Sequence, residues 1–390
     1  MITVDAALAE LFALVSPLDA EDVPLTKAYG RVLAKDVHAT RNQPPFAASA
    51  MDGYAVDGSA IRQGQTFRIV GEAAAGHRWD GTVQQGQAVR IFTGAPLPTG
   101  TDHVIIQENV ARDGDIITLD DSANSASHVR PAGADFRTGD AISAPRVLTP
   151  ADIALLAAMN IATVPVTRKP SVAIIATGDE LVQPGEMPGD DQIIASNSYG
   201  LAALVESLGG HARLLPIARD TQSSLALAFD LAADADLIVT IGGASVGDHD
   251  LVGAVAQTKG LQRSFYKIAM RPGKPLMAGR MGNATMIGLP GNPVSAMVCG
   301  HIFLAPVLRK MLGLGAHPAP RTTATLAKDV AANGPREHYM RAHEGPEGVT
   351  IFDRQDSALL TVLANANCLA VRPINDPDRQ AGNVIEIIRL

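Results

Sequence analysis

Two cations lie close together in a loop that prolines restrain, in the segment Arg271-Pro272-Gly273-Lys274-Pro275, and Lys267 lies four residues upstream of Arg271. The chain as a whole is acidic, with 32 Lys and Arg against 40 Asp and Glu and a formal net charge of −8. A local concentration of positive charge in such a chain favours recognition of an oxyanion or a phosphate. An ordinary solvated surface loop is the alternative interpretation.

Two glycine-rich loops each follow an expected strand and precede an expected helix. They are the GLPGNPVS segment at 288–295 and the GGASVG segment at 242–247. Glycine allows the backbone to approach a ligand closely, and the free N–H groups at a helix start favour an anion. Neither loop has the P-loop or GxGxxG pattern, so a plain turn and helix start is an equal alternative.

Carboxylates recur at expected loop positions, at Asp52, Asp135, Glu180, Asp220 and Asp250. Each alone is typical of a turn or a helix cap. Several of them around a phosphate pocket would suit Mg²⁺, which prefers oxygen ligands. The ten histidines form no HxH or HExxH motif, and the two cysteines form no CxxC motif. The sequence therefore favours neither a zinc site nor a hydrolase triad.

Composition excludes several classes of protein. Hydrophobic residues make up 46% of the 390 residues and charged residues 18%, which is typical of folded domains. The length predicts two or three domains. Aromatic residues are scarce at 4% and the chain is acidic, so we expect no nucleic-acid partner. The sparse cysteines fit a reducing compartment and predict a cytoplasmic protein.

Two apolar segments bear on membrane association. Residues 1–15 carry Asp5 and Glu10 without a basic region, and their apolar positions follow helical spacing, so they predict a helix and not a signal peptide. Residues 286–308 carry no charged side chain, but prolines and glycines interrupt them. We expect a loop followed by a helix there and no membrane partner.

The middle of the chain alternates strand-like and helical patterns. Strands are expected at 171–177, 213–218 and 236–241, with helices at 198–209 and 221–233. This alternation predicts a parallel sheet with crossover helices, in which ligands bind at the carboxyl ends of the strands. We assign residues 170–316 to this α/β domain.

The flanking segments are richer in strands. Short β-like runs at 66–70, 88–92, 103–107 and 116–119 predict a β-rich domain over 41–145. A helix expected over 149–160 starts with a clear cap, and it suggests a discontinuous N-terminal helical and linking domain made of 1–40 and 146–169. After a proline-containing linker, residues 317–390 return to strands and predict a small β-barrel or sandwich, with the barrel preferred.

Six motifs occur in a fixed order: SAMDGYAV (49–56), FTGAPLPTG (92–100), ATGDEL (176–181), GGASVGDHD (242–250), RPGKP (271–275) and GLPGNPVSA (288–296). Together they resemble the molybdopterin molybdenumtransferase family, known as MoeA in bacteria and as the E domain of gephyrin in animals. The resemblance spans nearly the whole chain. It implies a four-domain homodimer, a doubly wound α/β domain like that of molybdopterin adenylyltransferases, and an active cleft that the partner subunit helps to form.

The reaction that the resemblance implies is the Mg²⁺-assisted insertion of molybdate into adenylylated molybdopterin, with release of AMP. The molybdate pocket would comprise Arg271, Lys274, Pro275, Arg341 and Ser357. The catalytic cleft positions would be Asp52, Thr93, Asp135, Glu180, Asp220 and Asp250, with Asp135, Glu180 and Asp250 as candidate Mg²⁺ ligands. The pterin phosphate or the nucleotide would contact Arg130, Gly242, Gly243, Ser245, Gly247, Lys267, Pro290, Gly291, Asn292 and Pro293.

The chain departs from the family pattern at a few positions. Ala47 and Ala48 stand where the family often has Asp and Asn, and Arg271 stands where lysine is common. The segment 130–135 is also less charged than its usual counterpart. A peptide-binding scaffold of the gephyrin type, a tungstate-inserting enzyme and an adenylyltransferase are the alternative hypotheses. The expected partners are the adenylyltransferase and the molybdoenzymes that accept the cofactor.

Overall fold

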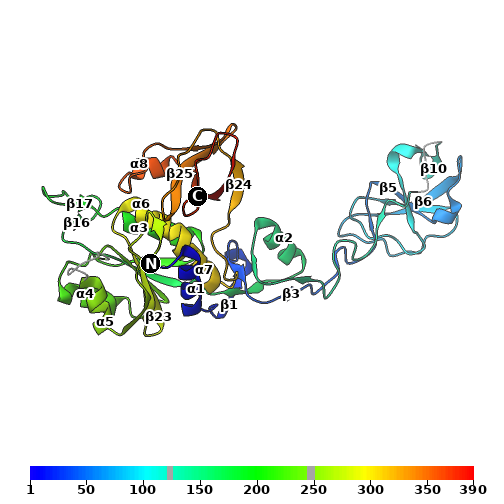
Figure 1. Ribbon diagram of the computed structural model, residues 1–390. Coiled ribbons are helices and arrows are strands. Elements are labelled where there is room, and N and C mark those ends of the chain that lie inside the picture. Colours follow the sequence, from blue (N-terminus) through cyan, green and yellow to red (C-terminus); the bar gives the residue numbers. More distant parts are fainter. Residues whose placement is uncertain (121–125, 244–250) are drawn as a thin grey trace. The chain divides into compact units, whose positions relative to one another are not determined.

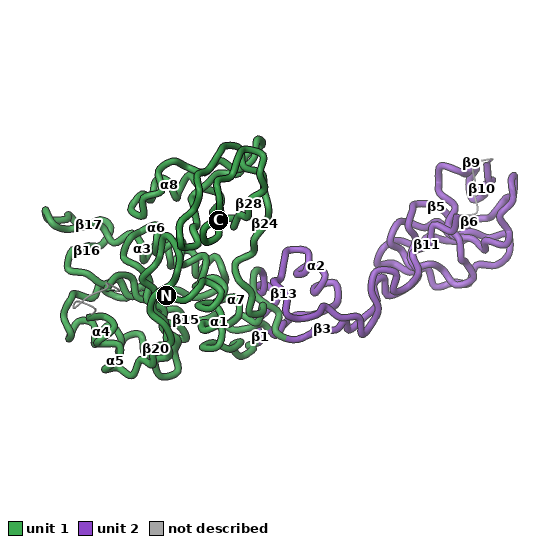
Figure 2. Tube along the Cα trace, in the orientation of Figure 1, with its two compact units in different colours: residues 1–21, 30–34, 166–390 green, residues 22–29, 35–165 purple. Residues whose placement is uncertain are grey.

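The computed structural model describes residues 1–120, 126–243 and 251–390 of the chain. These residues form two compact units (Figure 2). Unit 1 comprises residues 1–21, 30–34 and 166–390, and unit 2 comprises residues 22–29 and 35–165. The fourfold division into domains stays a prediction. Ser245, Gly247 and Asp250, three of the expected site residues, lie outside the described residues.

The central sheet of unit 1 has the strand order β18-β15-β19-β23-β22-β20. Its strands are β15 (Ser171–Ala176), β18 (His211–Leu214), β19 (Leu237–Ile241), β20 (Leu261–Phe265), β22 (Met277–Met281) and β23 (Ala284–Leu289). The strands from β18 to β23 pair in parallel, as predicted, whereas β22 pairs antiparallel with both β23 and β20. Continuous apolar runs such as LIVTI in β19 suit this sheet because both of its faces are covered.

Helices cover both faces of this sheet (Figure 1). One face packs against α1 (Val4–Leu14), α3 (Asn197–Ser207), α6 (Pro293–Cys299) and α7 (Ala305–Met311). The other face packs against α4 (Gln222–Leu231) and α5 (Leu251–Thr258). The expected helices at the N-terminus, at 198–209 and at 221–233 are confirmed. The strand expected over 213–218 lies earlier, at His211–Leu214, and only an isolated bridge joins Ala218 to Thr177.

Over 286–308 the chain forms the end of β23, a short loop and a helical run, so the expected loop and helix are confirmed. The helical run Pro293–Met311 is apolar enough to cross a membrane by composition, but 72% of its apolar window is buried inside the protein. The run includes a π-helical turn at Gly300–Leu304, where the N–H of Ala305 donates to the carbonyl of Gly300. Pro306 has no N–H to donate to the preceding turn, so the widened turn accommodates it within the helix.

The C-terminal strands of unit 1 form a second sheet, in the order β21-β25-β27-β28-β24, with β26 paired to β25. They are β21 (Met270–Arg271), β24 (Thr322–Thr325), β25 (Glu337–Gly345), β26 (Gly348–Ile351), β27 (Cys368–Arg372) and β28 (Val384–Arg389), with α8 (Leu360–Ala364) between β26 and β27. Because β21 pairs with β25, the sheet brings Arg271 beside His338.

Unit 2 is built around a sheet in the order β8-β5-β7-β6-β10-β9. The strands are β5 (Gly53–Val56), β6 (Thr66–Ala73), β7 (Gln87–Ile91), β8 (His103–Ile106), β9 (Val110–Asp113) and β10 (Ile116–Leu119). Apolar clusters around Phe67 and Val89 cover its two faces. The β-rich prediction for this region is confirmed.

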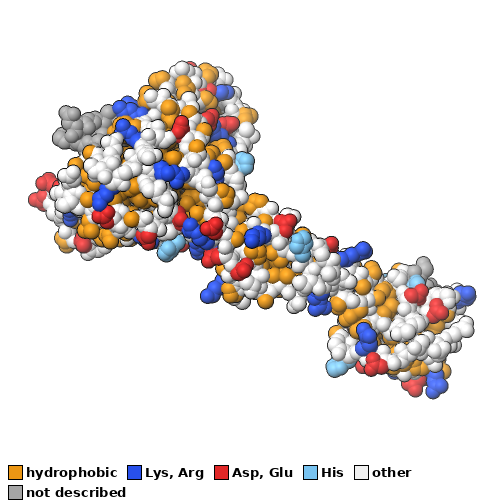
Figure 3. Space-filling model, turned by 90° about the horizontal axis from the view of Figure 1, so that it is seen from below, with side chains coloured by type: hydrophobic (Ala, Val, Ile, Leu, Met, Phe, Trp, Pro, Cys, Tyr) orange, Lys and Arg blue, Asp and Glu red, His pale blue; other side chains and the backbone are white. Residues whose placement is uncertain are grey.

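The remaining elements are short, apart from the predicted α2 (Pro150–Ala158). A reciprocal capping box between Thr149 and Asp152 starts α2, as the sequence indicated. The others are β1 (Ala20–Pro24), η1 (Leu25–Lys27), β2 (Val32–Leu33), β3 (Val37–His38), β4 (Ala48–Ser49), η2 (Gly58–Ala60), η3 (Gln107–Asn109), β11 (Val129–Arg130), β12 (Ala141–Ile142), β13 (Arg146–Val147), β14 (Thr163–Thr167), β16 (Leu181–Val182) and β17 (Ile193–Ile194). On the face shown in Figure 3, cationic and acidic side chains are interspersed.

Candidate functional site

A cavity of about 1050 Å³ lies in unit 1 at the carboxyl ends of β15, β19 and β23. The chain goes from β15 to β18 on one side, and β19 then pairs on the other side of β15. The loops that follow β15 and β19 therefore diverge, which is where open α/β sheets usually bind ligands. The sequence-predicted residues that line this cavity are Glu180, Asp220, Gly242, Gly243, Pro275, Pro290, Gly291, Asn292 and Pro293.

Two carboxylates reach the cavity from neighbouring loops. Glu180 lies in the turn after β15, and Asp220 lies just before α4. The two loops are joined because the N–H of Asp220 donates to the Asp179 carboxylate at 3.1 Å, and Arg219 donates to the Asp179 carbonyl at 2.9 Å. Both carboxylates are exposed, so they are free to meet a ligand in the cavity.

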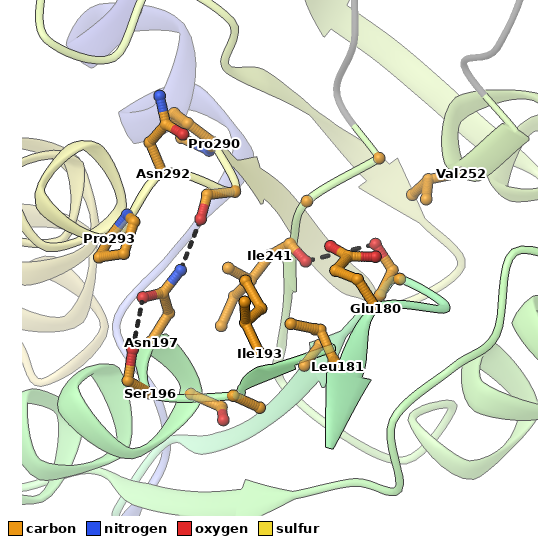
Figure 4. A pocket seen from close by; sticks show the side chains of 18 of the residues that line it. Glu180, Leu181, Ile193, Ser196, Asn197, Ile241, Val252, Pro290, Asn292 and Pro293 are labelled. Carbon is orange, nitrogen blue, oxygen red and sulfur yellow. Dashed lines mark hydrogen bonds between the residues drawn. The ribbon is translucent and has the colours of Figure 1, made fainter. Parts of the chain in front are cut away.

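The opposite wall is the loop of the GLPGNP motif, and side chains hold it from two directions. The amide of Asn197, in the first turn of α3, donates to the carbonyl of Gly291 at 2.7 Å (Figure 4). The amide of Asn292 donates to the Ser357 hydroxyl at 3.0 Å, and the N–H of Val294 donates to the Ser357 carbonyl at 2.9 Å. Ser357, an expected oxyanion contact, is therefore tied directly to the cavity wall.

Glycines bring the loop after β19 close to the other two. Gly242 and Gly243 have φ of +92° and +65°, values that side chains rarely adopt. A β-carbon built on Gly243 would lie 2.1 Å from the side chain of Val252, and one on Gly291 would lie 3.5 Å from the Cα of Gly242. The two glycine-rich loops expected from the sequence thus converge on one cavity.

Arg341 is a fully buried cation beside the same wall. Its Nη2 donates to the carbonyl of Asp356 at 3.3 Å, next to Ser357. Its Nε has no hydrogen-bond partner among the described residues. Burial, followed by the neighbouring positive charge of Arg271, lowers the pKa of Arg341 to about 10, so it remains a cation at neutral pH. An unpaired N–H on a buried guanidinium suits an anionic ligand.

The RPGKP loop supplies the other cations. Pro275 lines the cavity, and the side chains of Arg271 and Lys274 form no ion pair with any described residue. Lys267 lies apart from the cavity lining, with its Nζ 5.4 Å from the ring centroid of Tyr266. Arg271 and Lys274 are both exposed, which an oxyanion-binding loop and an ordinary solvated loop would each require.

Unit 2 holds the remaining expected residues. The Oδ1 of Asp52 accepts hydrogen bonds from both the N–H and the hydroxyl of Thr93, each at 2.8 Å. These bonds, led by that from the N–H, hold the pKa of Asp52 below its usual range. Arg130 ends β11, and Asp135 is exposed, with its N–H donating to the carbonyl of Gln43 at 2.9 Å. Asp52 and Thr93, predicted separately, form one hydrogen-bonded pair.

No group of three or more His, Cys, Asp or Glu side chains with the geometry of a metal site occurs within 1–120, 126–243 and 251–390. Of the expected Mg²⁺ ligands, Glu180 lines the cavity of unit 1, Asp135 lies in unit 2, and Asp250 falls outside the described ranges. Glu180 and Asp220 share one cavity, and two carboxylates suffice for Mg²⁺ when substrate phosphates complete its coordination.

Sequence reasoning missed two residues near the site. Asn197 fixes the position of Gly291 through its amide. The sequence signal for it was the Ser196-Asn197 pair, because Ser and Asn are common where a loop meets the start of a helix. His338 is buried between Arg271 and Arg372 on neighbouring strands. Its position depends on strand register, which local sequence does not reveal.

The fold and the cavity define a protein with a ligand-binding type of α/β domain and β-rich flanking regions. Sequence families match in the same order: "MoeA N-terminal region (domain I and II)" at residues 2–160, "Probable molybdopterin binding domain" at 173–310 and "MoeA C-terminal region (domain IV)" at 323–390. The chain belongs to the MoeA family of molybdopterin molybdenumtransferases, which are transferases of molybdenum cofactor biosynthesis.

Similar proteins span the full length of the chain. The molybdopterin molybdenumtransferase of Haemophilus influenzae is 35% identical over 99% of this chain and 98% of its own length. The one from Nostoc is also 35% identical, over 97% of this chain and 92% of its own length. The molybdopterin biosynthesis MoeA protein of Pyrococcus horikosii, known from a crystal structure, is 28% identical, with a TM-score of 0.87 and coverage of 100% of this chain and 99% of that chain.

Proposed function

We propose that this protein inserts molybdenum from molybdate into adenylylated molybdopterin and releases AMP. The observation that supports this most directly is the cavity at the point where the strand order of the α/β sheet reverses. There Glu180 and Asp220 face a loop that is hydrogen-bonded to Ser357, and the neighbouring carbonyl of Asp356 accepts a hydrogen bond from the buried cation Arg341. A site that joins carboxylates to a buried guanidinium with one unpaired N–H suits a substrate with both a phosphoanhydride and an oxyanion.

The cations of the site would bind molybdate, which is a dianion at neutral pH. Arg341 offers an unpaired Nε–H, and Arg271 and Lys274 add positive charge on the loop that ends at the cavity-lining Pro275. Arginine presents its donors in a fixed fork, which orients a tetrahedral oxyanion by direction as well as by charge. Ser357 adds a hydroxyl at the boundary between these cations and the cavity.

The cavity would bind the adenylylated pterin. Its volume of about 1050 Å³ is sufficient for a nucleotide-sized ligand, and Gly242, Gly243 and Gly291 present backbone to it without a side chain. Glu180 and Asp220 would accept hydrogen bonds from the water that attacks the phosphoanhydride. The Asp52–Thr93 pair, which the resemblance assigns to the catalytic cleft, would contribute a third carboxylate to the reaction.

Mg²⁺ is part of this proposal. Glu180 and Asp220 would hold the ion together with a substrate phosphate, because Mg²⁺ binds through one or two carboxylates and keeps much of its remaining coordination for phosphate and water. When bound, it neutralises negative charge that develops as the phosphoanhydride breaks. Asp135 and Asp250 remain further candidates from the resemblance.

The finer assignments also belong to the proposal. We expect a cytoplasmic homodimer that receives its substrate from the adenylyltransferase and passes the cofactor to molybdoenzymes. We also propose that the C-terminal strands close into a small barrel. The parallel bridge between Leu326, just after β24, and Val349 of β26 supports closure, because it links the two ends of the strand order.

The test is AMP release from adenylylated molybdopterin by the purified protein with Mg²⁺, with and without molybdate. Molybdate-dependent release of AMP, together with activation of a cofactor-free molybdoenzyme, is the expected result. Tungstate added in competition identifies which oxyanion is preferred. Bound substrate with no AMP release under any of these conditions would refute the proposed transferase activity.

A further inference from the structure

Arg90 occupies an unusual place in unit 2, between two aromatic rings. Its guanidinium carbon lies 5.0 Å from the ring centroid of Tyr54 and 4.8 Å from that of Phe92. Its Nη1 donates to the carbonyl of Gly53 at 3.0 Å, and its Nη2 donates to the Gln107 side chain at 2.5 Å. Two rings and two acceptors therefore fix the orientation of this guanidinium.

Three of the four groups that hold Arg90 directly adjoin the Asp52–Thr93 pair. Gly53 follows Asp52 in the chain, and Phe92 precedes Thr93. The N–H of Gln107 donates to the backbone carbonyl of Asp52 at 3.1 Å. Arg90 thus contacts both segments whose side chains meet in the two hydrogen bonds from Thr93 to the Asp52 carboxylate.

The backbone at this place leaves little freedom for repacking. Gly53 lies opposite Ile91 on β7 and opposite Ile106 on β8, and a β-carbon on Gly53 would lie 2.0 Å from the carbonyl oxygen of Ile105. Tyr54 lies opposite Arg90 in the same antiparallel pair, so their side chains share one face of the sheet. Removal of the guanidinium would leave the Gly53 carbonyl and both rings without the group that joins them.

The charge of Arg90 also reaches Asp52. After the two hydrogen bonds from Thr93, the positive charge of Arg90 is a further cause that lowers the pKa of Asp52. Ionisation of Asp52 strengthens both hydrogen bonds from Thr93, because a charged acceptor binds its donors more tightly. The geometry and the charge of Arg90 therefore act on the same carboxylate.

We propose that Arg90 is a positioning residue that holds the Asp52 carboxylate and the Thr93 side chain in their paired arrangement for the reaction. This inference rests on the proposed function, because it gives the pair a part in AMP release. Arg90 itself acts through Gly53, Phe92 and Gln107 and need not touch the substrate.

The experiment compares the full-length protein with Arg90→Met, Arg90→Lys and the control Arg68→Met. Arg68 is an exposed arginine on β6 of the same sheet, so its replacement removes the same charge without disturbing the pair. Protein labelled with ¹³C at the aspartate carboxyl, with Asp52→Asn to assign the signal, gives the Asp52 titration without any assay of activity. Steady-state AMP release gives kcat and the molybdate KM, and circular dichroism checks folding.

We expect Arg90→Met to raise the pKa of Asp52 and to lower kcat about 10- to 100-fold, with the molybdate KM unchanged. Arg90→Lys keeps the charge but loses the fork and the stacking, so we expect a near-normal Asp52 titration and a reduced kcat. Arg68→Met should match the wild type in both measurements.

An Asp52 titration that is unchanged in Arg90→Met would overturn the inference, whatever the rate. A shifted titration with an unchanged kcat would also overturn it, since Arg90 would then affect Asp52 without serving the reaction. If the wild type releases no AMP, the proposed function fails, and a shifted titration would still support the coupling of Arg90 to Asp52. If Arg90→Met does not fold, the kcat of Arg90→Lys decides: a reduced kcat supports the inference, and a wild-type kcat overturns it.

Discussion

Glu180 and Asp220 are the acidic side chains that line the cavity among the residues that the structure describes. Glu180→Gln and Asp220→Asn keep the size of each side chain and remove its charge. Because a positioned carboxylate commonly contributes a factor of 100 or more, we expect each substitution to lower the rate of AMP release about 100-fold. Initial rates at saturating molybdate and substrate measure this.

The control for these variants is Asp191→Asn, which removes an exposed carboxylate that does not line the cavity. It should release AMP at the wild-type rate. Circular dichroism should show the same fold in all three variants. Wild-type rates in both Glu180→Gln and Asp220→Asn would remove these residues from the catalytic site.

The burial of His338 leads to a prediction about how the stability of the protein depends on pH. Burial, and after it the charges of Arg271, Arg341, Arg336 and Arg372, lower its pKa from 6.5 to about 3. The unfolded chain binds a proton at this residue below pH 6.5, whereas the folded chain does not until about pH 3, so the native state loses stability as the pH falls between these values. At pH 5 this loss amounts to about 2 kcal/mol.

His338→Gln removes the titrating group. When the pH is lowered from 7.5 to 5, the free energy of unfolding of this variant should therefore fall less than that of the wild type. Urea unfolding at the two pH values measures the difference. His343→Gln, an exposed histidine of the same strand, is the matched control and should behave like the wild type. Equal losses in His338→Gln and the wild type would contradict a buried neutral imidazole.

At the scale of elements, the RPGKP loop depends on one glycine. Gly273 has a φ of +103°, and a β-carbon there would lie 2.4 Å from the sulfur of Cys299 on α6. Gly273→Ala should therefore push the loop and its cations out of place. We expect a higher molybdate concentration for half-maximal rate and a loss of about 1–3 kcal/mol in stability.

Gly260→Ala separates the two effects of that substitution. Gly260 has a φ of +91°, but a β-carbon there would meet no atom within 4 Å. Gly260→Ala should lower stability through similar backbone strain, while the molybdate concentration needed for half-maximal rate stays unchanged. The importance of loop placement is disproved if the two variants require the same molybdate concentration.

The elements also show how far sequence reasoning reaches. The buried strands and the glycine-rich loops after β19 and β23 were predictable, because their apolar runs and turn residues act locally. Arg341 and Ser357 came from the resemblance alone, since nothing in a window around either residue marks a buried cation or a hydroxyl beside a loop. The Ser196-Asn197 pair could have indicated a side chain near a loop, but its partner Gly291 was not predictable, because the contact joins residues 94 positions apart.

At the scale of the whole molecule, net charge and site charge have opposite signs. The chain carries a formal charge of −8, yet the proposed substrates are anions. Attraction must therefore come from the local cluster of Arg271, Lys274 and Arg341 and not from the overall field of the protein. Screening at higher ionic strength weakens the overall repulsion and the local attraction together, so the buried Arg341 should carry most of the affinity at high salt.

The proposed homodimer leads to a prediction about two inactive variants. Asp52→Asn and Glu180→Gln are co-expressed with different affinity tags, and the mixed dimer is purified through both tags. If each catalytic centre takes Asp52 from one copy and Glu180 from the other, as the resemblance implies, the mixed dimer contains one intact centre and one doubly substituted centre. It should then release AMP at about half of the wild-type rate, although either variant alone is nearly inactive. A mixed dimer as inactive as its parents would mean that each copy supplies its own Asp52 and Glu180, and a monomeric mass in light scattering would reject the dimer itself.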